Sequence, residues 1–154
     1  MTEAAAMAWR DARMTHVKNG VYGEMFVAAM IAAAFTQREV EAVIRSGLAV
    51  IPRASRLRFA VEEAMEDYRQ GKSAMEALDS IHRRWDEKSG HDWCHTISNA
   101  VICVTALLYG QGDFTRTLSI SLMGALDTDC NAATAGSILG VMLGAGNLPG
   151  SWVD

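Results

Sequence analysis

Helix start and stop signals recur at short intervals along this chain of 154 residues, and no stretch shows the alternation of apolar and polar residues typical of strands. Ser73 with Glu76 matches a capping box, in which two side chains satisfy the first amides of a helix. Asp113 is a preferred N-cap residue, and Gly71 and Gly110 are placed to end helices. We therefore predict an all-α, multi-helix bundle-like fold.

The predicted helices cover approximately residues 3–14, 21–35, 36–47, 52–70, 73–85, 92–109, 113–124 and 129–144. The segment 21–35 is apolar almost all round, which is typical of a buried central helix. Thr36 with Glu39 matches a further capping box, at the start of the next helix. No linker divides the sequence, so we expect a single domain over residues 1–154.

Composition and charge argue against several classes of partner. The net charge of −4 gives no basic footprint for nucleic acid. The first residues lack the basic and then apolar pattern of a signal peptide, and the apolar run 21–35 is shorter than the ~20 residues that cross a bilayer. Cys94, Cys103 and Cys130 have no C-x-x-C spacing, so we expect small buried thiols in a reducing compartment. We predict a cytoplasmic protein that binds neither nucleic acid nor membrane.

Two carboxylates, Asp127 and Asp129, stand one residue apart before an apolar run rich in small residues. Hard cations such as Mg²⁺ take oxygen ligands, and Mg²⁺ usually needs only one or two protein carboxylates. The same residues could instead cap the helix, because Asp is a preferred N-cap residue. The spacing leaves both interpretations open.

Two histidines are candidates for ligand binding. His16 precedes the apolar segment beside Asn19 and Gly20, where a loop could face a metal cleft. His95 and Asn99 are four residues apart, so on a helix they share a face and could contact a ligand or each other. A structural polar contact would explain the pair equally well.

Glu24 is the one charged residue within the predicted buried helix. A buried carboxylate needs a partner or a function. Its place in the first turn also suits the helix dipole, and the sequence favours neither explanation.

Several separate motifs occur in a fixed order along the chain. They are residues 16–30 (HVKNGVYGEMFVAAM), 47–48 with 51–52 and 55–57, 93–96 (WCHT) with Asn99, 110–114 (GQGDF), 127–131 (DTDCN) and 148–152 (LPGSW). Together they resemble the bacterial branch of the ADP-ribosylglycohydrolase family, relatives of dinitrogenase reductase-activating glycohydrolase.

The resemblance implies a metal site at the two carboxylates of the 127–131 motif. Asp127 and Asp129 match the family's C-terminal ligands of paired Mg²⁺ ions, for which Mn²⁺ is a substitute. Cys130 occupies a place where many members have a ligating Thr, although a thiol is a soft and poor Mg²⁺ ligand. The resemblance also gives candidates for substrate binding near this metal site, which are His16, Asn19, Gly20, Glu24, His95, Asn99, Thr128 and Asn131.

The chain also departs from the family pattern. The opening Gly-Asp-Ala-x-Gly segment and the Thr-Asp-Asp motif, which supply the other metal ligands, have no counterpart here. We therefore expect this chain to correspond to the C-terminal half of the family fold, with an incomplete metal site. Asp11, Glu24 and Asp92 are the available substitutes for the absent carboxylates.

Two functions follow from the resemblance. The first is metal-dependent hydrolysis of an ADP-ribosyl N-glycosidic bond, or binding of ADP-ribose or an ADP-ribosylated substrate. The alternative is a catalytically inactive truncated homologue that acts as an oligomeric binding or regulatory module. Half of a helical fold exposes apolar faces, and the commonest closed assembly is a two-fold homodimer, so we expect a dimer.

Overall fold

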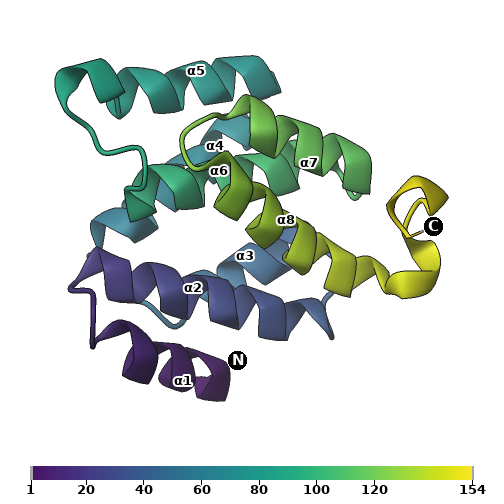
Figure 1. Ribbon diagram of the computed structural model, residues 1–154, viewed down its shortest axis with the longest axis horizontal. Coiled ribbons are helices and arrows are strands. Elements are labelled where there is room, and N and C mark those ends of the chain that lie inside the picture. The colour runs from purple at the N-terminus through teal and green to yellow at the C-terminus, as the bar shows by residue number, and fades with distance from the viewer. Residues whose placement is uncertain (1, 154) are drawn as a thin grey trace.

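The computed structural model describes residues 2–153, which form eight α-helices and three short 3₁₀-helices and contain no strand (Figure 1). The α-helices are α1 (Thr2–Ala12), α2 (Asn19–Ala34), α3 (Val40–Leu48), α4 (Arg56–Arg69), α5 (Ala74–Arg84), α6 (Thr96–Gly110), α7 (Phe114–Met123) and α8 (Thr128–Leu143). The 3₁₀-helices are η1 (Glu87–Ser89), η2 (Ala145–Asn147) and η3 (Gly150–Trp152). The predicted all-α fold is confirmed.

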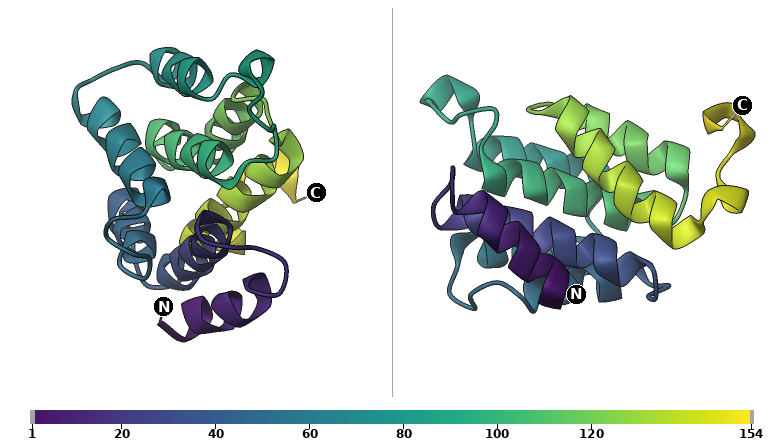
Figure 2. Two further views of the ribbon diagram at one scale, coloured as in Figure 1. Left: turned by 90° about the vertical axis from the view of Figure 1, so that its left-hand side faces the viewer. Right: turned by 60° about the horizontal axis from the view of Figure 1, so that its bottom comes forward.

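Helix α6 is the centre of the molecule. Thirteen of its 15 residues are buried, and helices α2, α3, α4, α5, α7 and α8 all pack against it. The left view of Figure 2 shows α6 in the middle of a ring formed by the other helices. Ile102 and Leu107 of α6 are fully buried with Phe26 of α2, Leu57 of α4 and Ile138 of α8. One continuous apolar core therefore holds the chain together.

Helix α2, which was predicted to be the buried central helix, lies at the side of the bundle instead. Phe26 and Met30 face the core, but Glu24 is exposed and Phe35 is 69% exposed. Its opposite side is covered by α1, so two faces of α2 are packed without the helix being central. In residues 2–153, neither α2 nor any other helix is long and apolar enough to cross a membrane.

Capping side chains begin three of the helices, and two of these caps, Ser73 and Asp113, were predicted. Ser55 and Asp113 accept the amides of Arg58 and Arg116 at the starts of α4 and α7. At α5, the Ser73 hydroxyl accepts the amide of Glu76, and the Glu76 carboxylate accepts the amide of Ser73 at 2.8 Å. The hydrogen bonds from Ser73 hold the pKa of Glu76 below its usual value. Each such cap contributes about 1 kcal/mol to helix stability.

Three predicted helix starts lie too early in the chain, and one of these is α4, which was predicted from residue 52 and begins at Arg56. The Thr36 hydroxyl donates to the Ala33 carbonyl at the end of α2, so it caps no helix, and α3 begins only at Val40. The helix predicted from residue 92 begins at Thr96, because residues 92–95 form a turn that ends in the N-cap residue His95. In the last two places a nearby polar side chain bonds to the backbone of a turn or of the preceding helix.

Glycines allow two close helix contacts. A Cβ atom at Gly23 of α2 would overlap the Thr96 side chain at the start of α6. A Cβ at Gly136 of α8 would lie 3.1 Å from Leu118 of α7, whereas one at Gly140 would lie 3.7 Å from the Phe114 ring, an ordinary van der Waals contact. The α2–α6 contact therefore depends on a missing side chain, and the α8 contact at Gly140 does not.

These contacts predict opposite effects for two substitutions of glycine by alanine. Gly140→Ala should stabilise the protein by up to about 1 kcal/mol, because alanine favours a helix interior and space is available. Gly23→Ala should destabilise it by about 1 to 3 kcal/mol, because it forces α2 away from Thr96. Urea unfolding of both variants measures the difference, and equal stability would contradict the close α2–α6 approach.

Candidate functional site

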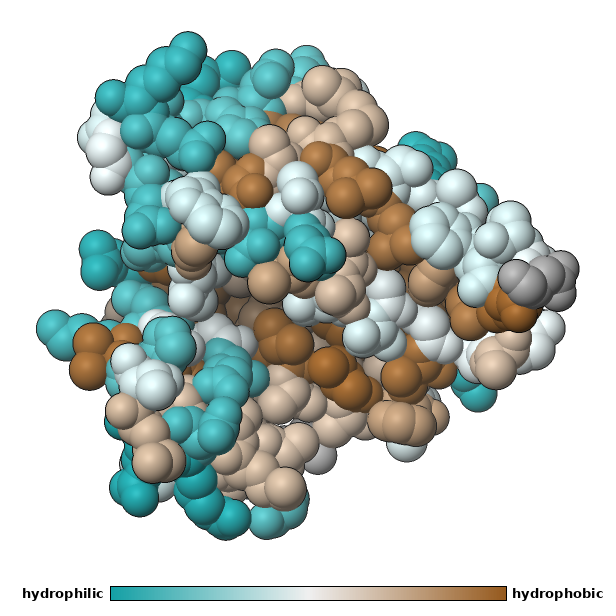
Figure 3. All heavy atoms as spheres, in the orientation of Figure 1, coloured by the Kyte–Doolittle hydropathy of each residue, from teal (hydrophilic) through white to brown (hydrophobic). Residues whose placement is uncertain are grey.

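Helices α2, α6 and α8 meet with the end of α1 around a cavity of about 450 Å³. Figure 3 shows this face hollowed between α2 and the starts of α6 and α8, with hydrophilic side chains gathered toward its left and apolar ones toward its right. The volume lies within the usual range of small-ligand pockets.

Each of the three helices presents the same spacing of residues to this cavity. The lining residues are Gly20, Gly23, Glu24 and Val27 on α2, Thr96, Asn99, Ala100 and Cys103 on α6, and Asp127, Cys130, Asn131 and Thr134 at the start of α8. The positions are i, i+3, i+4 and i+7 in every case, which is one face of an α-helix. The cavity is thus the point where three helix faces converge, and Asp11, Thr15 and His16 close its edge.

Three carboxylates line this cavity from three different helices. Asp127 comes from the start of α8, Glu24 from α2 and Asp11 from the end of α1. The prediction that Glu24 is buried is wrong, because Glu24 is exposed and lines the cavity. Partial desolvation raises the pKa of Glu24, hydrogen bonding and repulsion from Asp11 raise it further, and nearby His16 opposes the shift. The cavity therefore concentrates negative charge.

Asn99 holds the two sides of the cavity together. Its amide oxygen accepts the backbone N–H of Asp127 at 3.1 Å and the side-chain amide of Asn131 at 2.7 Å. Its amide nitrogen donates to the carbonyls of Trp93 at 2.8 Å and His95 at 3.1 Å. All hydrogen-bonding capacity of the side chain is used. Asn99, predicted to bind substrate, lies in the cavity wall and fixes the position of Asp127.

Asn131 and Cys103 continue this internal network. Asn131 is 2% exposed, and both its backbone and its side-chain oxygens accept from the Cys103 thiol, at 3.5 and 3.6 Å. Burial raises the pKa of Cys103 to about 12, so it remains a thiol. Asn131 was also predicted to bind substrate, and its polar atoms are bonded within the protein.

The predicted metal ligands lie together at the start of α8. Asp127 is the N-cap residue of this helix and accepts the amide of Cys130 at 3.4 Å, as the capping interpretation predicted. Asp129 is exposed and, like Thr128, is not among the residues that line the cavity. No group of three histidine, cysteine or carboxylate side chains that could hold a metal ion occurs within residues 2–153.

The thiols differ from the prediction that all are buried. Only Cys103 is buried; Cys94 and Cys130 are exposed, and all three are free. A side-chain hydrogen bond with Asp127, then desolvation and the charges of Asp127 and Asp129, raise the pKa of Cys130. Cys130 is therefore held as a thiol, which is unsuited to binding Mg²⁺.

His16 and Gly20 lie together at the edge of the cavity. The His16 ring is exposed, and its Nδ1 lies 2.7 Å from the Thr15 hydroxyl. A Cβ atom at Gly20 would lie 2.9 Å from the His16 Cβ, so glycine is needed for the loop to turn back over α2.

Two predicted ligand-binding residues instead cap helices and line an adjoining cavity. The Asn19 amide oxygen accepts the N–H of Leu57 at 3.2 Å, at the start of α4. His95 Nδ1 accepts the N–H of Ile97 at 3.2 Å, at the start of α6. Both residues line a second cavity of about 460 Å³ beside the first.

Sequence reasoning named Asp11 as a substitute for the absent carboxylates but missed other residues of the cavity, namely Thr15, Gly23, Val27, Cys94, Thr96, Ala100, Cys103 and Thr134. Four of them were within reach of a simple rule. Starting from Glu24, Asn99 or Asn131 and stepping three or four residues along the helix gives Val27, Thr96, Cys103 and Thr134. The same rule explains why Asp129, two residues from Asp127, lies off this face.

A family model described as ADP-ribosylglycohydrolase matches residues 1–154, the whole chain. The chain belongs to the ADP-ribosylglycohydrolase family. The resemblance seen in the sequence motifs is thereby confirmed, and the helical fold agrees with it. No curated protein and no solved structure matches the chain.

The Asn99 network predicts a large effect of an isosteric change. Asn99→Asp removes the N–H donors to Trp93 and His95 and should destabilise the protein by about 1 to 3 kcal/mol. Asn147→Asp is the matched control, because Asn147 donates a single hydrogen bond, to the Leu143 carbonyl, from an exposed site. Thermal unfolding compares the two, and equal losses would contradict the special role of Asn99.

The His95 cap predicts a pH dependence of stability. Desolvation, then His91 and Arg56, lower the pKa of His95, with Asp92 opposing. The unfolded chain binds a proton near pH 6.5 and the folded one does not, so stability should fall as pH decreases below that value and level off below the folded pKa. His95→Asn keeps a capping oxygen that does not titrate and should flatten this loss in unfolding curves between pH 7.5 and 5. An unchanged pH profile would contradict the assignment.

Proposed function

We propose that the cavity binds the ribosyl end of an ADP-ribosyl compound and that the protein acts in hydrolysis of its N-glycosidic bond. The observation that supports this most directly is the convergence of Asp127, Glu24 and Asp11 on one cavity. Ribose hydroxyl groups donate hydrogen bonds to carboxylates. Cleavage of a glycosidic bond develops positive charge on the sugar, which a negatively charged cavity stabilises.

The scaffold of the cavity suits this role. The Asn99 network fixes the backbone at Asp127, so its carboxylate is positioned before a ligand arrives. His16 and Thr134 supply further polar groups on the lining. A rigid cavity loses little conformational entropy on binding.

The donor set at the start of α8 fits Mg²⁺ as a partial shell. Asp127 and Asp129 would hold the ion through hard oxygens, and water and substrate would complete its coordination, which is common for Mg²⁺. Such an ion would orient the ribose hydroxyl groups and a water molecule and polarise that water for attack on the sugar. The absence of a third nearby ligand among residues 2–153 disfavours a closed site of the zinc type.

The alternative, an oligomeric binding module, has its own support in the structure. Met7 is 61%, Met14 82% and Val17 79% exposed, on α1 and the loop after it. We infer that this side pairs with a second copy of the chain, giving a homodimer. The two exposed free thiols, Cys94 and Cys130, favour a reducing compartment such as the cytoplasm.

Calorimetric titration with ADP-ribose, with and without Mg²⁺, tests the proposed function. Asp127→Asn keeps an N-cap oxygen but loses the charge, and it should weaken binding at least tenfold, equivalent to about 1.4 kcal/mol. Asp129→Asn should remove only the part of the affinity that Mg²⁺ adds.

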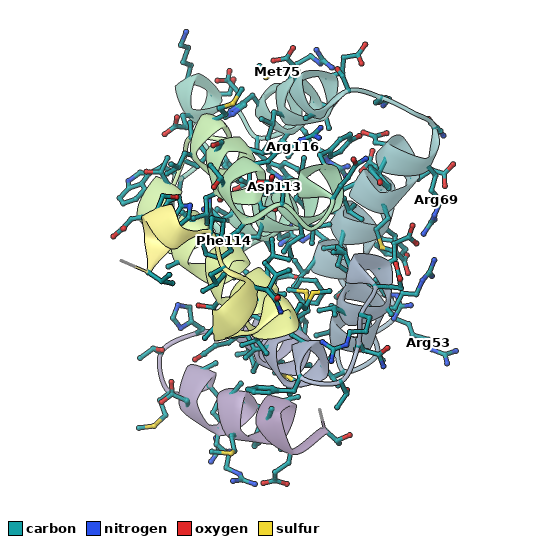
Figure 4. The ribbon with its side chains drawn as sticks, turned by 90° about the vertical axis from the view of Figure 1, so that its right-hand side faces the viewer. Arg53, Arg69, Met75, Asp113, Phe114 and Arg116 are labelled. Carbon is teal, nitrogen blue, oxygen red and sulfur yellow. The ribbon has the colours of Figure 1, made fainter. Side chains whose placement is uncertain are left out.

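The matched control is Asp113→Asn, the same change at the N-cap of α7, which lies outside the cavity (Figure 4). It should bind as the wild type does. If the wild type does not bind ADP-ribose, the proposed function is contradicted. Hydrolysis that does not depend on Asp127 would place the reaction outside this cavity.

A further inference from the structure

The cavity that holds the carboxylates opens into a second one. The second cavity, of about 460 Å³, shares part of its wall with the first. The shared residues are Thr15, His16, Gly20, Cys94 and Thr96. The two cavities therefore form one continuous groove along the α1–α2 and α5–α6 loops, which lie at the same end of the molecule in Figure 1.

The second cavity carries the opposite charge. Lys18 and Arg56 line it with one carboxylate, Asp92, whose oxygen accepts the N–H of Cys94 at 2.8 Å. None of the ion pairs formed among residues 2–153 involves Lys18 or Arg56. His95, which also lines the cavity, has its pKa lowered by desolvation, His91 and Arg56, so it adds no charge at neutral pH. Two cations without an ion-pair partner thus face this part of the groove.

Both cations stand where the fold alone disfavours them. Arg56 is the first residue of α4, and Lys18 is the N-cap residue of α2 with φ of 48°. Cations at a helix N-terminus oppose the helix dipole. Arg58, two residues after Arg56, has Glu62 as a partner at 2.7 Å. The placement of Arg56 has no such structural explanation.

A larger groove elsewhere is the main competitor for an anion. It has a volume of about 780 Å³ and is lined by Arg45, Arg53, Arg58 and Arg69. Three of these arginines are already neutralised: Arg45 and Arg69 pair with Glu41, and Arg58 pairs with Glu62. Figure 4 shows Arg53 and Arg69 projecting outward from this side. The smaller cavity therefore offers more free positive charge.

We propose that Arg56 and Lys18 bind the diphosphate of an extended ligand whose ribose occupies the carboxylate cavity. The inference rests on the proposed function for the ribose and on the groove for the diphosphate. Guanidinium groups bind phosphate oxygens in a bidentate manner, and the ammonium adds a point charge. Beyond Arg56, Trp85, Phe59 and His91 line a third cavity, which gives the far end of the ligand an aromatic surface.

The test uses the full chain with inorganic pyrophosphate and ADP-ribose as probes, by calorimetry at low ionic strength. Arg56→Gln should weaken the binding of both probes at least fivefold while leaving Tm unchanged or higher, because it removes a cation from a helix start. Arg53→Gln, in the competing groove, and Arg116→Gln, at the start of α7, make the same charge change and should stay within twofold of the wild type (Figure 4).

Other outcomes separate this inference from the proposed function. Asp127→Asn should weaken ADP-ribose binding and leave pyrophosphate binding unchanged. Pyrophosphate binding that depends on Arg56 without any ADP-ribose binding would sustain the anion site and refute the proposed function. Equal affinity for pyrophosphate and ADP-ribose would contradict the binding of an extended ligand and would indicate a site for free phosphate. Unchanged binding in Arg56→Gln, or a larger loss in Arg53→Gln, would overturn the inference altogether.

Discussion

Four hydrogen bonds from the side chain of Asn99 connect the parts of the chain on which the cavity depends. They join the turn before α6, through the carbonyls of Trp93 and His95, to the start of α8, through Asp127 and Asn131. These two segments are far apart in sequence and are not paired through their backbones. A single amide side chain therefore sets the distance between two walls of the cavity, and Asn131 with Cys103 extends the connection into the core.

The loops before α2 and α8 are strained. Ala125 and Leu126, just before Asp127, have φ of 53° and 55°, and Lys18, just before α2, has φ of 48°. The left-handed backbone conformation costs a non-glycine residue about 1 to 2 kcal/mol of free energy. Such strain persists only where surrounding interactions fix the backbone, and it gathers at functional sites. Of the four non-glycine residues with a left-handed backbone in residues 2–153, Lys18 lines the groove, and Ala125 and Leu126 directly precede Asp127, which also lines it.

The sequence predicted the fold well where local chemistry decides it. The caps at Ser55, Ser73, Asp113 and Asp127 start helices because their side chains satisfy the first amides whatever the tertiary context. The central helix was misassigned, because residues 21–35 and 96–110 are both apolar almost all round. Which of them is enclosed depends on how the other helices surround it, and that information is not local.

The candidate site was predicted in part for a related reason. Seven named candidates line one cavity, namely His16, Gly20, Glu24, Asn99, Asp127, Cys130 and Asn131. Asn19 and His95 line the adjoining cavity instead, and the side chains of Asn19, His95 and Asn99 bond to the backbone. The same amide or imidazole can cap a helix or contact a ligand, and residue identity does not distinguish these roles. The cations Lys18 and Arg56 were not singled out, because only the fold shows that they lack an acidic partner.

We expect ligand to bind in the groove between α2, α6 and α8. An NMR titration of isotope-labelled protein with ADP-ribose tests it directly, because amide chemical shifts report the site residue by residue. The largest changes are expected at Gly20, Gly23 and Asp127 and at the side-chain amides of Asn99 and Asn131. Changes confined to the arginine groove between Arg45 and Arg69, or no changes at all, would contradict it.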